Sequence, residues 1–206
     1  MRGSRGQRRM QHLRQSVAAE AARLMSEQGI RDFRQAKHKA AQRLGLSDEK
    51  SLPRNAEIEE ALRQHQRLFE GPGHDRLLAS RRRAALEAMR FFERFDPRLV
   101  GAVLDGTADR HCAVCLHLFC DNPEEVDEFL ASQGIPFETQ SRRLRVQRDQ
   151  WQDFPVYLFA AADIPVDITV LPVDAVRQAP IDRSGDRPMA RASLAVLERL
   201  IETEHG

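Results

Sequence analysis

The chain has 206 residues, of which 41% are hydrophobic and 31% are charged, and its formal net charge is +1. This balance is typical of a folded, water-soluble protein, and it excludes a disordered chain or a global positive field that attracts nucleic acid. No apolar run approaches the roughly 20 residues that span a bilayer, and three clustered cysteines make a poor disulfide framework. We therefore expect a cytoplasmic protein with no membrane partner.

The first half of the chain predicts helices. Residues 1–15 are rich in arginine and have little to bury, which indicates a flexible basic arm. Apolar residues then recur at helical spacing over residues 16–95, with Gly29 and Gly45 placed as C-terminal caps and Asn55 as an N-terminal cap. The predicted helices cover about residues 16–28, 32–44, 55–69 and 76–94. We expect residues 16–95 to form a helical region.

The second half, residues 96–206, predicts a small sheet. Short runs rich in Val, Leu, Ile and Phe alternate with turn residues there. The predicted strands are Arg98–Val100, Ala113–Phe119, Arg143–Val146, Pro155–Ala160 and Val166–Leu171. A helix near residues 122–134 separates the second and third strands, and a final helix is expected over Ser193–Glu202. The predicted fold class is α+β: an N-terminal helical region followed by a small mixed β-sheet with flanking helices.

One part of this half has the layout of a known fold. Gly101-Ala102 follows the first strand, Gly106-Thr107 lies in the turn, and about ten residues separate Ala102 from Ala113 and Cys115 on the second strand. A later strand carries an embedded Asp167. Over about residues 88–172 this layout resembles the nucleotidyltransferase fold of the polymerase-beta type, whose motif is Gly-Ser and then Asp-x-Asp. The resemblance implies nucleotide contacts from Gly101, Ala102, Gly106, Thr107, Ala113 and Cys115.

The residues that carry the family's chemistry are largely replaced. The family holds two divalent metal ions on strand carboxylates two residues apart, but Ala113 and Cys115 stand at those positions and Ala102 replaces the serine. A thiol is a poor ligand for Mg²⁺, which prefers oxygen. We therefore expect a protein that binds a nucleotide or nucleic acid, or assists a protein partner, with impaired catalysis. The alternative is an active nucleotidyltransferase whose Mg²⁺ site joins Asp167 to Asp105, Asp109 or Asp121.

The same stretch also suggests thiol or metal chemistry. His111, Cys112, Cys115, His117 and Cys120 are residue types that bind zinc. Strand alternation places Cys115 and His117 on one face and Cys120 on the other, so thiols packed in a sheet are favoured over zinc. Two alternatives stay open: a soft metal held by Cys115, His117 and Asp167, and a Cys115–His117 nucleophile pair.

Basic side chains offer a third kind of function. Arg34, Lys37, Lys39 and Arg43 lie on the second predicted helix, and Arg81–Arg83 form a block on the fourth. Such faces occur in helix-turn-helix regulators that bind DNA or RNA, although most charged helix faces are simply solvated. Arg142, Arg143, Arg145 and Arg148, near Trp151, are placed to bind a nucleotide or a single strand, or to protect an edge strand. Arg187 and Arg191, further on, are placed to approach a ligand.

Overall fold

The computed structural model describes residues 3–30, 32–46, 52–69, 71–147, 149–182 and 187–204. The chain divides into two compact units, Met1–His74 and Asp75–Gly206. Within the described ranges, no helix is both long enough and apolar enough to cross a membrane.

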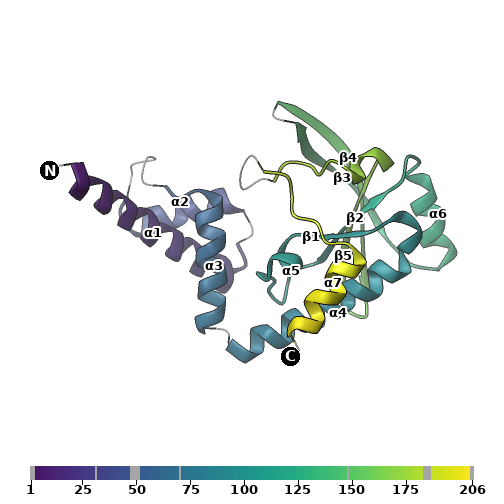
Figure 1. Ribbon diagram of the computed structural model, residues 1–206, viewed down its shortest axis with the longest axis horizontal. Helices are drawn as coiled ribbons and strands as arrows, with labels where there is room; N and C mark the ends of the chain where they lie inside the picture. The colour runs from purple at the N-terminus through teal and green to yellow at the C-terminus, as the bar shows by residue number, and fades with distance from the viewer. Residues whose placement is uncertain are drawn as a thin grey trace. The chain divides into compact units, whose positions relative to one another are not determined.

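The first unit is helical. It contains α1 (Gly3–Gln28), α2 (Phe33–Arg43) and α3 (Asn55–Phe69), which appear in Figure 1. Its core is made mainly of small and aliphatic side chains, including Leu24 of α1, Ala40 of α2 and Ile58 of α3, all fully buried. Asp32 caps α2, because its Oδ1 accepts a hydrogen bond of 2.7 Å from the Gln35 backbone N–H.

Most of the segment expected as a basic arm is helical in the structure. The first helix begins at Gly3, so the segment 3–15 is helical although its described side chains are mostly exposed. Arginine, glutamine, methionine and leucine dominate this segment and all have high intrinsic helix propensity. The segment therefore extends a helix that is anchored further along by Val17 and Leu24, and the lack of buried positions was a poor guide to its conformation.

The second unit is built on one mixed sheet. Its strands are β1 (Arg98–Val100), β2 (Val114–Phe119), β3 (Glu138–Gln147), β4 (Gln150–Ala161) and β5 (Ile164–Leu171), in the spatial order β1-β2-β5-β4-β3. The β2–β5 pair is parallel, and the other three neighbouring pairs are antiparallel. The predicted α+β fold class is confirmed, with a mixed sheet and flanking helices (Figure 1).

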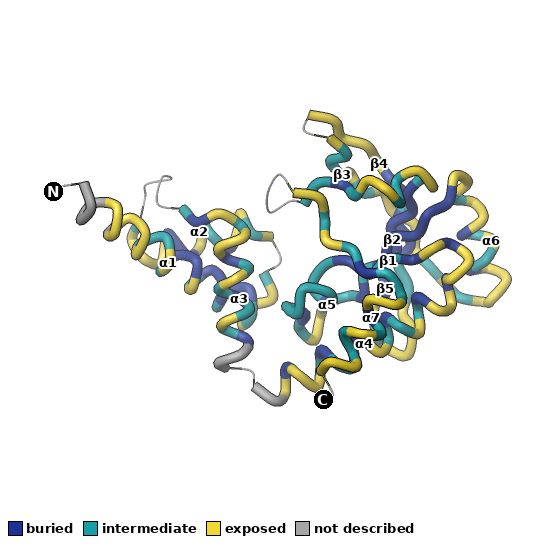
Figure 2. The backbone as a smooth tube through the Cα atoms, viewed as in Figure 1, coloured by how far each residue is buried: buried dark blue, intermediate teal, exposed yellow. Residues whose placement is uncertain are grey.

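Three helices cover one face of this sheet. They are α4 (Gly71–Phe91), α6 (Glu124–Ser132) and α7 (Leu194–Glu204). Met89, Leu130 and Leu197, one from each helix, are fully buried in the same cluster as Leu116 and Ile168 from the central strands. This cluster is the main hydrophobic core of the unit, and it includes the central strands that are dark blue in Figure 2.

Shorter elements connect the strands. A 3₁₀ turn, η2 (Glu93–Phe95), leads into β1, and α5 (Ala102–Asp105) follows it. After β5, a second 3₁₀ turn, η3 (Val173–Val176), packs through Ala175 and Val176 against a small cluster made by Phe119, Leu144, Phe154 and Leu171. That small cluster lies on the face of the sheet opposite the three helices, because its strand residues alternate with those of the main core.

Candidate functional site

Polar side chains gather on the sheet face opposite the three helices. In the strand register His117 of β2 lies between Arg98 of β1 and Thr169 of β5, and Cys115 lies directly opposite Asp167. Alternate strand residues share a face, so these side chains all lie on the side away from the main core. Two further arginines join them: Arg142 bonds to Asp167 and Thr169, and Arg191 lies over the same Phe119 ring as Arg98. The sheet-face cluster comprises Arg98, Cys115, His117, Arg142, Asp167, Thr169 and Arg191.

Arg142 holds the carboxylate of Asp167. Its Nη1 donates to Asp167 Oδ1 at 2.8 Å and its Nη2 to Oδ2 at 2.7 Å, while Nη1 also donates to Thr169 Oγ1 at 2.8 Å. Arg142 comes from β3 and Asp167 from β5, so the arginine side chain crosses the intervening strand β4. The hydrogen-bonded Asp167 raises the pKa of Arg142. Both oxygens of Asp167 therefore already bind a cation in the form of a guanidinium.

Arg191 brings a positive charge without a carboxylate. Its Nη1 donates to the Ala175 carbonyl at 2.9 Å and its Nη2 to the Val176 carbonyl at 2.8 Å, and its guanidinium carbon lies 5.4 Å from the centre of the Phe119 ring. In the described part of the chain no carboxylate forms an ion pair with it. Burial and the neighbouring Arg98 both lower the pKa of Arg191. Arg98 lies over the same ring at 5.9 Å and pairs with Asp96.

His117 is buried and neutral between these arginines. His117 is only 2% exposed. Burial, together with the positive charges of Arg191 and Arg142, lowers its pKa to about 3. Its Nδ1 has no hydrogen-bond partner among the described residues. A buried polar atom left unpaired costs about 1–3 kcal/mol, so this nitrogen marks a position where an added hydrogen-bonding group is favourable.

The predicted glycine turn lies beside this cluster. Gly101 has a φ of 72°, a conformation that favours glycine, and a Cβ added there would lie 3.9 Å from Cys115 Cβ. Ala102 begins α5, Gly106 ends it with a φ of 76°, and the Thr107 N–H donates to the Ala102 carbonyl at 2.9 Å. These four residues therefore form one compact turn next to β2.

Cys115 and Ala113, the two motif positions predicted on the second strand, differ in their relation to Asp167. Cys115 and Asp167 are register partners, whereas Ala113 comes immediately before β2 and its carbonyl accepts a weak bond of 3.6 Å from Cys115 Sγ. The structure therefore brings Gly101, Cys115 and Asp167 together, with His117 two residues further along the same face.

The other candidate carboxylates lie in turns or at the end of a helix, and two of them accept hydrogen bonds from the backbone. Asp109 Oδ1 accepts from the His111 N–H at 2.7 Å, and Asp121 Oδ1 accepts from the Val173 N–H at 2.9 Å. Asp105 is the last residue of α5. Asp121 follows the far end of β2, roughly 20 Å from Cys115 at the rise of about 3.3 Å per strand residue. The structure thus separates Asp121 from Asp167.

The cysteines and histidines do not converge. Cys120 Sγ donates to the Asn122 carbonyl at 3.0 Å, and burial raises its pKa. Cys112 Sγ accepts from the Asp109 N–H at 3.3 Å, in the turn before β2. Over the described ranges, no group of three or more His, Cys, Asp or Glu side chains is placed to hold a metal ion. Cys115 and His117 share a face, as the alternation predicts, and are accompanied there by arginines.

The predicted basic surfaces are largely occupied by contacts inside the protein. Lys37 Nζ donates to the Pro53 carbonyl at 3.0 Å, Lys39 Nζ to Gln28 at 2.9 Å, and Arg43 pairs with Glu20 at 3.2 Å. The interpretation of Arg81–Arg83 as a surface block is wrong for its first two members. Arg81 is 8% and Arg82 is 4% exposed.

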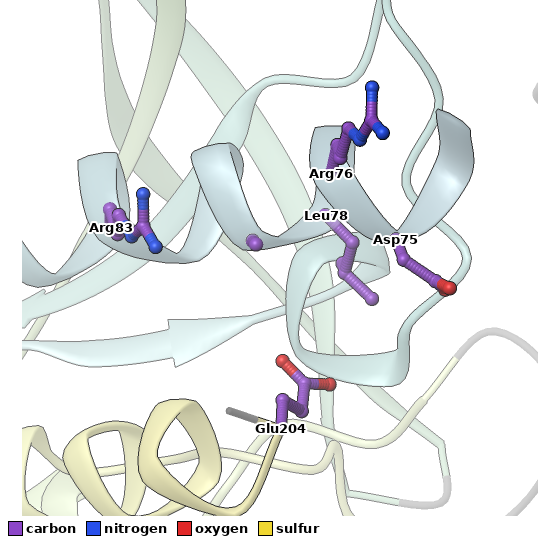
Figure 3. A pocket seen from close by; sticks show the side chains of 6 residues that line it. Asp75, Arg76, Leu78, Arg83 and Glu204 are labelled. Atoms are coloured by element: carbon purple, nitrogen blue, oxygen red, sulfur yellow. The ribbon is translucent and has the colours of Figure 1, made fainter. Parts of the chain in front are cut away.

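Arg81 and Arg82 bind the loop before β2 and the last helix. Arg81 Nη2 donates to the Arg110 carbonyl at 2.7 Å, and Arg82 Nε donates to the Val103 carbonyl at 3.2 Å. Arg82 also pairs with Glu204 at the end of α7. A hollow next to this pair is lined by Asp75, Arg76, Leu78, Ala79, Arg83 and Glu204. In Figure 3, the side chain of Glu204 points toward α4, while that of Arg76 points away from the helix. No residue of the sheet-face cluster lines this hollow.

Comparisons of the chain with protein-family models, with curated proteins and with solved structures found no match.

Sequence reasoning identified some of the cluster and missed the rest. It singled out Cys115, His117 and Asp167, but it assigned no site role to Thr169 or Arg98. Strand alternation could have found Thr169, which lies two residues after Asp167 on β5. The partnership of Arg142 with Asp167 depends on the strand order, and the sequence carries no local signal for it.

Proposed function

We propose that residues 75–206 form a nucleotidyltransferase-like domain that binds a nucleotide through the sheet-face cluster and does not transfer it efficiently. The observation that carries this proposal is the parallel register of Cys115 with Asp167, with Gly101 placed so that an added Cβ would lie 3.9 Å from Cys115 Cβ. The nucleotidyltransferase resemblance implies a glycine turn before the second strand and a carboxylate inside a later strand, and this juxtaposition supports the proposal.

The chemistry of the cluster favours binding over transfer. Transfer in this class of enzyme needs carboxylates that hold two divalent ions at the reacting phosphate. Ala113 and Cys115 supply no such ligand, and the one carboxylate at the expected position, Asp167, is engaged by Arg142 through both oxygens. A guanidinium at this place neutralises charge but supplies no nucleophile and no exchangeable ligand position.

The charge of the cluster suits an anion. Arg98, Arg142 and Arg191 contribute three positive charges, and Asp96 and Asp167 contribute two negative ones. His117 adds no charge at neutral pH, because its pKa is about 3. The excess is one positive charge, at Arg191, and phosphate oxygens are the ligands that arginine binds most specifically.

Equilibrium binding of the four ribonucleoside triphosphates to the purified chain tests the proposal. We expect at least one to bind, and we expect Arg191→Gln to weaken that binding about tenfold, because about 1.4 kcal/mol of charge-assisted hydrogen bonding is lost. The matched control is Arg199→Gln, an exposed arginine on α7 that should leave the affinity unchanged.

A transfer assay distinguishes binding from catalysis. Labelled nucleotides incubated with Mg²⁺ or Mn²⁺ and candidate acceptors should give no labelled product. Label transfer that disappears in Asp167→Asn would instead establish an active enzyme with a rearranged metal site, and it would contradict the proposal.

A further inference from the structure

The sheet-face cluster suggests how its ligand is held. We infer that the cluster binds a phosphate group without a divalent metal ion, with Arg191 and His117 as the groups that contact it. This inference rests on the proposed function and specifies it, because it names the ligand group and the manner of binding.

The ion pair between Asp167 and Arg142 argues against a phosphate that is bridged to the protein by a metal ion. Mg²⁺ needs several oxygen ligands, and the protein normally supplies them as one or two carboxylates. Asp167 is the cluster's carboxylate, and Arg142 binds both of its oxygens at 2.7 and 2.8 Å. A metal ion would have to displace this guanidinium, and the Arg142 Nη1 bond to Thr169 at 2.8 Å holds the guanidinium in place.

A second observation favours direct binding of the phosphate: the positive charge of Arg191 is available to an anion. Its Nη1 and Nη2 donate to backbone carbonyls, those of Ala175 and Val176, which do not neutralise a charge. An arginine has five N–H groups, so these two bonds leave donors to spare. Burial and Arg98 lower its pKa while Asp96 raises it, and a bound anion would offset the repulsion from Arg98.

His117 supplies the second contact. Its Nδ1 is buried and has no partner in the described part of the chain, while Arg191 and Arg142 both act on its charge from nearby. A neutral imidazole with its proton on Nδ1 is a donor, and a phosphate oxygen is the acceptor that satisfies it. The same anion would then lie between a cation and a neutral donor, with Thr169 and Arg98 as the neighbours of His117 in the strand register.

The experiment compares ATP, inorganic phosphate and adenosine as ligands by isothermal titration, each in EDTA and in Mg²⁺. We expect ATP and phosphate to bind in EDTA, adenosine to bind at least tenfold more weakly than ATP, and Mg²⁺ to leave the ATP affinity in place or reduce it. Arg191→Gln should lose at least tenfold in affinity for ATP and phosphate. Arg191→Lys should recover part of that loss, and Arg199→Gln should match the unchanged chain.

A second readout follows His117 directly. In a sample with ¹⁵N-labelled histidine, phosphate in EDTA should shift the Nδ1 resonance of His117, which is assigned by its absence in His117→Gln. The resonance of His111, an exposed histidine before β2, should not move and serves as the internal control. Circular dichroism on every variant establishes that a lost signal is not a lost fold.

The outcomes separate this inference from the proposed function. ATP binding only in Mg²⁺ would overturn the metal-free site while the nucleotide-binding proposal stands. Phosphate binding in EDTA with no binding of any nucleotide would overturn the nucleotide proposal and leave the phosphate site. An unmoved His117 resonance under saturating ligand would remove His117 from the site, and no binding of either ligand would overturn both.

Discussion

The two faces of the sheet in the second unit use the same strands for different purposes. On the face covered by α4, α6 and α7, Leu116 and Ile168 are fully buried in apolar surroundings. One residue further along each strand, His117 and Thr169 are equally inaccessible but are polar and lie among arginines. Because successive side chains of a β-strand point to opposite faces, residues that stabilise the fold and residues suited to binding follow each other directly in the sequence.

The covered face should be far more sensitive to truncation. Ile168→Ala removes a fully buried side chain from the main core, and we expect the free energy of unfolding to fall by about 3 kcal/mol because transfer and cavity costs add. The comparison on the other face is Cys115→Ala, at a half-buried position, with an expected loss under about 1 kcal/mol. Urea unfolding of both variants measures the difference, and equal losses would contradict the division between the two faces.

The face opposite the three helices should respond to pH through His117. The folded state lowers the pKa of His117 to about 3 from an ordinary value of 6.5, so the unfolded chain binds a proton more readily than the folded one. Stability therefore falls as the pH falls below 6.5 and continues to fall toward about pH 3. By pH 4.5 this histidine alone should have lowered the free energy of unfolding by about 2.5 kcal/mol relative to pH 7.

The variant His117→Gln isolates this effect, because other groups also titrate in this range. Thermal or urea unfolding between pH 4 and 7 should show a smaller loss of stability in His117→Gln than in the unchanged chain. His111→Gln is the matched control and should follow the unchanged chain at every pH. A parallel pH dependence in all three proteins would show that His117 is not buried in its neutral form.

The ion pair between Arg142 and Asp167 should give the smallest effect. Asp167→Ala leaves the Arg142 guanidinium, whose side chain is 30% exposed, without its carboxylate, and we expect a loss of about 1 kcal/mol. Arg142→Met alone should cost a similar amount. A double-mutant cycle measures their coupling, and a coupling near zero would mean that solvent screens the pair almost completely.

The sequence was sufficient to predict most elements but not their arrangement. Apolar runs located β1, β2 and β5, because these strands are buried at most positions. The strands β3 and β4 extend well beyond their predicted cores, since their outer residues are polar and exposed (Figure 2). The exposed ends of a hairpin pair through backbone hydrogen bonds, and this pairing does not require the apolar side chains by which a strand is predicted.

The site was predicted in part for a related reason. The family resemblance placed Cys115 near Asp167, and strand alternation placed His117 on the same side. Arg142 joins Asp167 only because β4 lies between β3 and β5, a fact of strand order that no local pattern contains. Arg82 shows the converse error: three consecutive arginines suggested a solvated block, but the helix directs this one inward to the Val103 and Leu104 carbonyls.

The parallel pairing of β2 with β5 also has a consequence for folding. The β3–β4 and β4–β5 connections are short, whereas Cys115 and Asp167 are about 50 residues apart in the chain and must close a long loop to meet. We expect the β3–β4–β5 meander to form before it docks on β2, since local contacts form faster than distant ones. The sheet-face cluster would then be among the last parts of the unit to assemble, and hydrogen exchange across the β2–β5 seam would report when it does.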